Sequence, residues 1–477
     1  MNNYSPIVAL SVALLSGCTL APHYERPAAP VAQAWPNDAT ISSPPAGLSI
    51  SGINWQSFLG DPRLQKIVAL ALENNRDLRV SVLNVAQTRA QYRIQQSALL
   101  PAIDATGSGS RGRTPADLSG FGQPFVGSQY GVGVGVTSYE LDLFGRVQSL
   151  KNQALESYFA TEEAQRSAEL TLVAEVAAQY FTERAYEEQY ALARQTLETV
   201  QRSYALTKRS FETGNSSELD LRTAEAQLHT AEYNLSVYSQ QHALAENALI
   251  LLVGQPLPSD LPTPQSLEKQ SVLADISPGL PSGLLQRRPD ILQAEHVLKS
   301  ANANIGAARA AFFPKITLTG SAGTSSAELS RLFKAGAKTW SFAPQITLPI
   351  FAGGYNRANL DVAKISKQIE VAHYEKAIQT AFREVADALT TRAAIEEQIS
   401  TQVARVSAEQ KRYDLSDLRY RHGVDNYLTV LLAQQDLYNA QQTLIQARLS
   451  RLSNLITLYK ALGGGWGDRS MKVAQTE

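Results

Sequence analysis

The sequence predicts an α+β membrane protein in which one structural unit is written twice. Each unit consists of a helix, a pair of strands, a long helix and a return helix. Two observations lead to this prediction. Long stretches with a heptad pattern alternate with short stretches of period two. Both kinds recur in the same order, and residues 204–223 align with residues 413–432 at an offset of about 209 residues.

Composition excludes several classes of function. The net charge of −1 comes from mixed signs without a basic stripe, so no nucleic acid is expected as a partner. No nucleotide-binding glycine loop, nucleophile elbow or HExxH motif is present, which argues against an enzyme. The histidines show no metal-ligand spacing, so no metal site is predicted. They are His23, His229, His242, His296, His373 and His422.

The amino terminus predicts export and a lipid anchor. Residues 1–17 hold a short apolar run that ends in Leu15-Ser16-Gly17, directly before the single cysteine, Cys18. This resembles a bacterial lipoprotein signal, cleaved so that Cys18 carries lipid such as palmitate. The alternative is an ordinary secretory signal with a coincidental cysteine, because the first six residues carry no Lys or Arg. Residues 18–55 are rich in Pro, Ala and Ser and predict an extended, lipid-anchored tether.

The first repeat is expected over residues 56–254. A helical pattern begins near Asp61-Pro62 and continues to Leu100, where Pro101 ends it. Period-two alternation then predicts strands at about residues 103–110 and 130–139. A long helix follows from about Arg146 to Phe211, and the return helix ends at Gly254.

The second repeat is expected over residues 287–465, after an equatorial connector at residues 255–286. Its strands are predicted at about residues 315–323 and 340–350, and its long helix begins near Asn356. The return helix ends at the glycines from 463 onward, and residues 466–477 form a tail.

The four strands require more than one chain. Each has one apolar face and one face of small or polar residues, as a membrane-spanning strand beside water would have. An open sheet edge in hydrocarbon leaves backbone groups unsatisfied, so spanning strands must close into a barrel. Two chains would give eight strands and a filled interior, whereas three would give twelve and a lumen. The small, polar inner faces favour the lumen.

Several short motifs then resemble the TolC-like outer-membrane efflux factors, in their lipoprotein (OprM-type) branch. They are LDLFGR at 141–146, RRPDIL at 287–292, AAFFP at 310–314, YRHGVDNYL at 420–428 and YKALGGGW at 459–466. The resemblance implies a homotrimer with a twelve-stranded outer-membrane β-barrel, continued by a periplasmic α-helical coiled-coil barrel. It also implies a passive exit duct without cofactors, anchored in outer-membrane lipid. The expected partners are a periplasmic adaptor (membrane fusion) protein and an inner-membrane transporter of the RND type, and the cargo is drugs or other small molecules.

The resemblance also places a gate at the two helix turns. Gly214 and Gly423 are expected to turn the chain, and Asn215, Ser216 and Val424 to contact the adaptor. Tyr420 and Asp220 are expected in a polar latch, and Leu428 in an apolar ring that gates by excluding water. Some family members carry aspartate rings where this chain has Thr429 and Leu432. Others carry an arginine where it has Asp425, so Arg222 or Arg419 is expected to supply the cation.

Each of these interpretations has an alternative. Leu428 and Leu432 fit packing against a neighbouring hairpin, Tyr420 fits a plain core aromatic, and Asp220 fits a charge in the first turn of a helix. At the level of function, the alternatives are the outer-membrane channel of a type I protein secretion system and a non-conducting exported coiled-coil scaffold.

Overall fold

The computed structural model describes residues 19–32, 35, 48–49, 53–120, 122–270, 272–273, 276–277 and 283–464. The chain divides into two compact units. The strand unit comprises Met1–Ala28, Asn84–Glu162 and Gln293–Glu375. The hairpin unit comprises Ala29–Leu83, Glu163–Leu292 and Lys376–Glu477. Both sequence repeats contribute to both units, so the units cut across the repeats.

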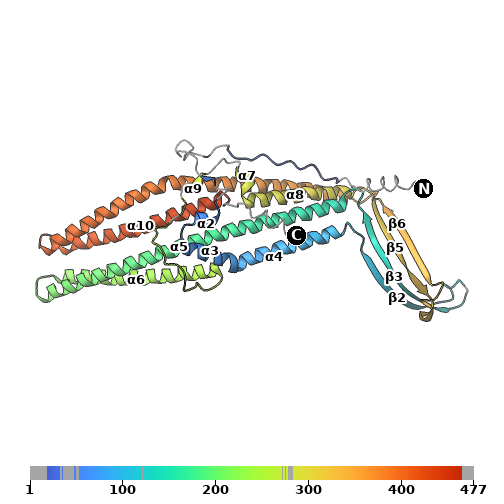
Figure 1. Cartoon of the computed structure of the whole chain (residues 1–477), viewed down its shortest axis with the longest axis horizontal. Coiled ribbons are helices and arrows are strands. Elements are labelled where there is room, and N and C mark those ends of the chain that lie inside the picture. Colours follow the sequence, from blue (N-terminus) through green and yellow to red (C-terminus); the bar gives the residue numbers. More distant parts are fainter. Residues whose placement is uncertain are drawn as a thin grey trace. The chain divides into compact units, whose positions relative to one another are not determined.

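The strand unit contains one antiparallel sheet with the strand order β2-β3-β5-β6 (Figure 1). Its strands are β2 (Ile103–Thr114), β3 (Phe125–Leu141), β5 (Lys315–Ser326) and β6 (Lys338–Thr347). The strand pair of the first repeat therefore meets that of the second at the central β3–β5 pairing. β2 and β6 stand at the two edges of the sheet.

The register gives this sheet two chemically different faces, as the alternation in the sequence predicts. Residues directly opposite one another in antiparallel strands share a face. One row across the sheet is apolar and consists of Ala105, Val134, Ala322 and Trp340. The adjacent row, which points to the other face, consists of Asp104, Gly135, Ser321 and Ser341.

The strand bounds differ from the prediction. β2 continues to Thr114 and β3 begins at Phe125, so the loop between them is shorter than the predicted loop at residues 110–129. β6 begins at Lys338 and ends at Thr347, before Leu348-Pro349. The reason is physical: glycines and arginines after Gly109 break the side-chain alternation, but the ladder pairs backbone groups and continues wherever a partner strand lies opposite.

The helical part of the strand unit packs through small residues. It contains most of α4 (Arg76–Ser97) and α8 (Pro289–Ala310), and the first parts of α5 (Arg146–Glu212) and α9 (Tyr355–Arg421). Ile305 and Ala308 of α8 form a buried cluster with Ala363 of α9. Between α5 and α8, the hydroxyls of Ser157 and Ser300 lie 3.0 Å apart. Small residues allow such close helix contacts.

The hairpin unit contains two long helical hairpins, α5 with α6 (Glu218–Val253) and α9 with α10 (Tyr427–Ala461). α5 and α9 each have 67 residues, which corresponds to about 100 Å of helix. Among its described residues, the unit also holds three shorter helices and one small parallel strand pair. These are α2 (Trp55–Phe58), α3 (Pro62–Asn74) and α7 (Leu284–Arg287), with β1 (Leu48–Ser49) beside β4 (Ile276–Ser277).

Aromatic stacking and one buried hydrogen bond join elements of this unit that are far apart in sequence. The rings of Phe58 and Tyr459 stack with centroids 4.1 Å apart. The fully buried Tyr180 donates its hydroxyl hydrogen to Asp61 at 2.8 Å. Burial and this partner raise the pKa of Tyr180. The tyrosine therefore remains a neutral donor.

The single helix predicted from Asp61-Pro62 to Leu100 is wrong, because the structure divides it into α3 and α4 at Asn75. Asn75 has an extended backbone (φ −62°, ψ 130°). Its side-chain oxygen accepts from the N–H of Leu78 at 2.9 Å, and its amide donates to the carbonyl of Leu252 at 2.8 Å. Asparagine competes with helical backbone bonds in this way and is favoured at caps.

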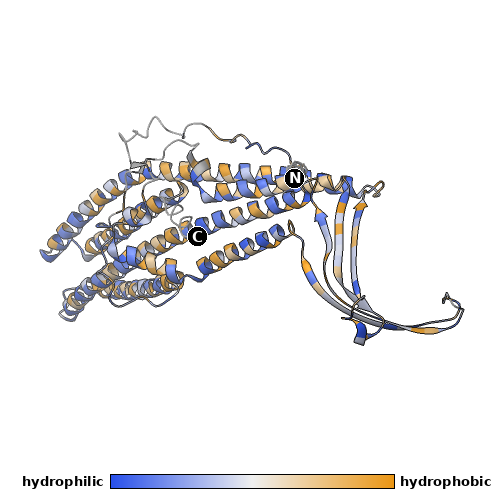
Figure 2. Cartoon of the chain, turned by 45° about the vertical axis from the view of Figure 1, so that its right-hand side comes forward, coloured by the Kyte–Doolittle hydropathy of each residue, from blue (hydrophilic) through white to orange (hydrophobic). Residues whose placement is uncertain are grey.

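Apolar and polar residues interleave along the helices in Figure 2, as expected for helices that bury one stripe. Among the helices of the described part of the chain, none is both long enough and apolar enough to cross a membrane.

Candidate functional site

The first hairpin turns at Gly214, which has a φ of 78°. The N–H of Gly214 donates to the carbonyl of Phe211 at 2.9 Å, and the N–H of Asn215 donates to that of Ser210 at 2.8 Å. This pair of bonds is the Schellman motif, which needs a left-handed residue after the helix. Glycine adopts that conformation without steric cost. The sequence predicted this turn correctly.

The second hairpin repeats this geometry at Gly423, with a φ of 70°. The N–H of Gly423 donates to the carbonyl of Tyr420, and the N–H of Val424 donates to that of Arg419, both at 2.9 Å. Asn215 and Val424, the residues after the two glycines, are exposed. Ser216 is half-buried, and its hydroxyl donates to Asp220 at 3.2 Å.

Asp220 completes a capping box at the start of α6. The hydroxyl and N–H of Ser217 donate to its carboxylate at 2.7 and 3.2 Å, and its own N–H donates to the Ser217 hydroxyl at 3.1 Å. The hydrogen bond from the Ser217 hydroxyl lowers the pKa of Asp220. These contacts fit the alternative to the polar latch, in which Asp220 is a charge in the first turn of a helix.

The pairing of the charged tip residues is local to each hairpin. The Arg419 guanidinium donates to both carboxylate oxygens of Asp425 at 2.7 and 2.9 Å, across the turn at Gly423. Arg222 pairs instead with Glu225 at 2.9 Å and Glu218 at 3.5 Å on its own helix. The cation beside Asp425 is therefore Arg419.

Tyr420 belongs to an aromatic cluster that joins the two hairpins. Its ring lies 5.3 Å from that of Tyr427, tilted by 47°. Both pack with Tyr204 and Ala224 of the first hairpin. Burial first, and then the negative charge of Asp220, raise the pKa of Tyr420. The structure thus brings Tyr420 near Asp220, while Asp220 makes its hydrogen bonds to Ser216 and Ser217.

Leu428 and Leu432 lie one turn apart on α10 and are exposed by 54% and 51%. Their neighbours Tyr427, Val430 and Leu431 are buried in the aromatic cluster. The two leucines therefore face away from the packing between hairpins within one chain. Leu219, at the equivalent position of the first hairpin, is also exposed.

The sequence reasoning missed Tyr427 and Thr207 as parts of this site. Tyr427 is buried at the first turn of α10, and Thr207 is a buried polar residue of α5. Thr207 continues the heptad seam of α5, a signal that was visible in the sequence. Tyr427 has no such signal, because its burial depends on Tyr420 and Tyr204 meeting it in space.

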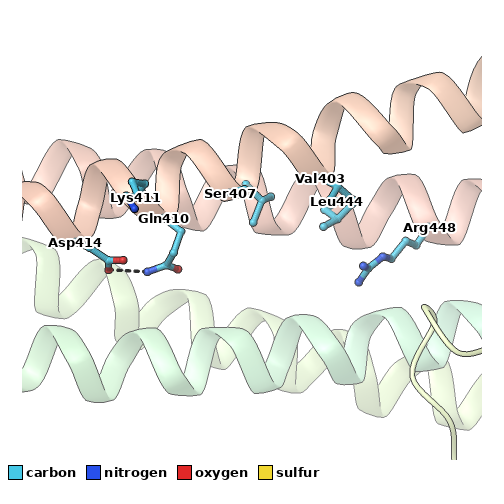
Figure 3. A pocket seen from close by; sticks show the side chains of 8 residues that line it. Val403, Ser407, Gln410, Lys411, Asp414, Leu444 and Arg448 are labelled. Atoms are coloured by element: carbon cyan, nitrogen blue, oxygen red, sulfur yellow. Dashed lines mark hydrogen bonds between the residues drawn. The ribbon is translucent and has the colours of Figure 1, made fainter.

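A groove of about 460 Å³ lies along the second hairpin, between α9 and α10. Figure 3 shows Gln410 donating to Asp414, with Lys411 beside them and Arg448 pointing in from α10. Val403 and Leu444 form its apolar part. Its mixed lining provides hydrogen-bonding groups of both kinds and charges of both signs.

Cys18 lies outside the described residues, but the segment directly after it is held against the strand unit. The hydroxyl of Thr19 lies 3.0 Å from that of Ser149 in the first turn of α5. The carbonyl of Leu20 accepts from Arg309 at 3.0 Å, and that of Pro22 accepts from Asn302 at 2.8 Å. We call residues 19–26 the strap. The predicted tether is thus docked along α8 at its beginning.

Glu295 of α8 binds Tyr24 and Arg26 at the C-terminal end of the strap. Arg26 donates to both of its carboxylate oxygens at 2.9 and 2.8 Å, and the Tyr24 hydroxyl donates at 3.1 Å. The Glu295 side chain is only 3% exposed. Burial alone would raise its pKa, but the hydrogen bond from Arg26 and the charge of Lys299 outweigh burial and lower it.

Comparison with known proteins assigns the chain to a family. The model of the family described as outer membrane efflux protein matches residues 67–255 and 280–464. The toluene efflux pump outer membrane protein TtgC of Pseudomonas putida is 49% identical, over 98% of this chain and 97% of that protein. The outer membrane protein OprJ of Pseudomonas aeruginosa is 45% identical, over 98% and 97%.

The fold is similar as well. The open state of the MtrE outer membrane channel of Neisseria gonorrhoeae is 43% identical and superposes with a TM-score of 0.86, covering 94% of this chain and 99% of that chain. The strand pairs with one apolar face and the long helical hairpins fit these similarities. The chain therefore belongs to the outer membrane efflux protein family.

Proposed function

We propose that three copies of this chain form a passive, gated exit duct in the outer membrane. Support comes from the sheet, whose edge strands β2 and β6 lack a second neighbour within the described chain. Such edges need partners in a bilayer, and further copies supply them. Twelve strands leave a lumen, which the row of Asp104, Gly135, Ser321 and Ser341 would line.

The duct serves a tripartite efflux pump, together with a periplasmic adaptor protein and an inner-membrane transporter of the RND type. The names of the relatives support this part, since TtgC is named as part of a toluene efflux pump. They favour small organic molecules over proteins as cargo. The duct performs no chemistry and moves what the transporter delivers.

The gate is formed by Leu428 and Leu432, repeated in each subunit around the lumen. The observation that carries this proposal is their exposure beside a buried aromatic cluster. Repeated around the lumen in three subunits, these side chains would form a narrow apolar ring, which excludes water and ions from a pore. Tyr420, which packs against the first hairpin, acts as the latch that holds the second hairpin in place, and the Arg419–Asp425 pair fixes the turn beside it. Asn215 and Val424 at the exposed turns contact the adaptor.

Single-channel conductance in a planar bilayer tests the gate. We expect a small conductance from the wild-type trimer and a clearly larger one from the double variant Leu428→Ala plus Leu432→Ala. Leu418→Ala is the matched control, because Leu418 lies on α9 before the turn and is 52% exposed. Equal conductance in all three proteins removes the gate but keeps the duct. No conductance from a folded trimer leaves only a scaffold.

A further inference from the structure

We propose that Glu183 and Glu187 of α5 and His242 of α6 form a binding site for a divalent transition metal ion, with Zn²⁺ as the reference ion. Nε2 of His242 lies 2.9 Å from a carboxylate oxygen of Glu183 and 3.0 Å from one of Glu187. All three candidate ligand atoms lie within 4.8 Å of one another. In the described part of the chain, this is the single group of at least three such side chains that converge in this way.

Two carboxylates converge on one ring nitrogen in this arrangement. Nε2 of His242 faces one oxygen of Glu183 and one of Glu187, and in the metal-free protein one N–H can be shared between the two. The Arg184 guanidinium donates to both oxygens of Glu183 at 2.7 and 2.8 Å. A divalent ion at this point takes the place of the proton between Nε2 and the two carboxylates, since metal ligands bind in their deprotonated form.

The ligand set and spacing fit zinc. Imidazole and carboxylate are both zinc ligands, at about 2.0–2.2 Å. In a tetrahedral site, ligand atoms at those distances lie about 3.3 Å apart, close to the 2.9 and 3.0 Å found around His242. The side chain of Glu187 is 44% exposed, so water can reach the fourth position. Cu²⁺ and Ni²⁺ are expected to compete, since nitrogen and oxygen ligands favour them as well.

The other histidines show why this one differs. His229 pairs with Glu232 on its own helix at 3.0 Å, and His373 pairs with Glu370 at 3.2 Å. Each of these pairs joins one imidazole to one carboxylate and is a simple hydrogen bond. His296 of α8 joins two helices through Glu156 of α5 at 2.6 Å, but it meets that one carboxylate. His242 joins two helices and meets two carboxylates that are four residues apart on one helix face. The ligands come from elements far apart in sequence, so motif spacing did not reveal them.

A bound ion would clasp α5 to α6 within one hairpin. α5 ends at Glu212 and α6 begins at Glu218, and the turn at Gly214 joins the two helices covalently. An ion held by ligands from both helices adds a second cross-link, which restricts splaying of this hairpin. The site is independent of the proposed duct: it can bind metal whether or not the chain conducts.

Titration of the full-length protein tests the site. The protein is purified without a histidine tag, freed of metal by a chelator and titrated with Zn²⁺ by calorimetry. We expect one ion per chain. We expect His242→Gln and Glu187→Gln each to weaken binding by at least about tenfold, whereas His229→Gln binds as the wild type does. Co²⁺ in place of Zn²⁺ is expected to give the visible absorption of a tetrahedral complex in the wild type and not in His242→Gln.

Three outcomes overturn the proposal. They are no binding by the wild type, undiminished binding by His242→Gln, and an equal loss in His229→Gln. Folding of each variant is checked by heat-modifiable trimer migration on a gel. If His242→Gln does not fold, Glu187→Gln decides, because Glu187 is half-exposed and its amide keeps the shape of the side chain.

Discussion

Glu295 shows how one residue can organise a segment that lacks regular structure. The strap has no helix or strand, so its backbone polar groups need partners elsewhere. Asn302 and Arg309 bind two of its carbonyls, and Glu295 binds two of its side chains. The buried Tyr374 lies near this clasp, and its pKa is raised by burial and then by the charge of Glu295. Charge-assisted, bidentate bonds such as Arg26–Glu295 are the strongest of these contacts.

Strap docking is expected to be lost in acid. The pKa of Glu295 is lowered in the folded protein, so its ionised form stabilises docking above the ordinary glutamate pKa of about 4.3. That contribution is lost as the pH falls through the lowered value. Limited proteolysis of the strap between pH 7 and pH 3 measures this. Protection that does not change over this range contradicts the assignment.

The variant Glu295→Gln isolates the same contact at neutral pH. Removing the charge leaves Arg26 without its anionic partner, and Arg26 is 44% exposed and can turn to water. We therefore expect a modest loss of about 1–2 kcal/mol of docking free energy, seen as faster cleavage within residues 19–26. Glu156→Gln is the control, since Glu156 pairs with His296 in the same unit and does not touch the strap in the described contacts. An equal effect in both variants would point to general loosening.

At the scale of elements, the two hairpin turns depend on glycine. Gly423 has nothing within 4 Å of the position where a Cβ would stand, so only its positive φ restricts substitution. We expect Gly423→Ala to cost about 1–2 kcal/mol at the turn and Gly423→Asn less, because asparagine tolerates this conformation. Hydrogen exchange in the last turn of α9 measures the difference. Equal exchange in both variants would show that the turn is not strained.

The sequence was sufficient where structure is decided locally. Gly214, Gly254 and Gly423 each stop a helix through their own backbone, and all three stops were predicted. The sequence was insufficient where a residue far away in the chain determines the local structure. β2 continues beyond the residues that alternate in polarity, because β3 pairs with its backbone. The helix is interrupted at Asn75, whose amide donates to the carbonyl of Leu252, far away in the sequence. The family resemblance left two candidates for the cation beside Asp425, Arg222 and Arg419, and the contacts across the turn at Gly423 decide for Arg419.

At the scale of the whole molecule, membrane attachment is expected from two independent sources, the barrel strands of the proposed duct and the lipid that the sequence predicts on Cys18. Cys18→Ser is expected to remove the acyl mass seen by mass spectrometry of the mature protein. The heat-modifiable trimer is expected to persist, because the sheet edges that bring copies together do not involve Cys18. An unchanged mass would exclude the lipoprotein interpretation in favour of an ordinary secretory signal.

The strap also has a mechanical consequence. Its contacts with α5 and α8 lie in sequence order along its length, from Thr19 to Arg26. A force applied at residue 18 parallel to the strap is shared by all of these hydrogen bonds at once. A force perpendicular to the helices would break them one after another. Lipid on Cys18, as we propose, would therefore transmit a force from the membrane into α5 and α8.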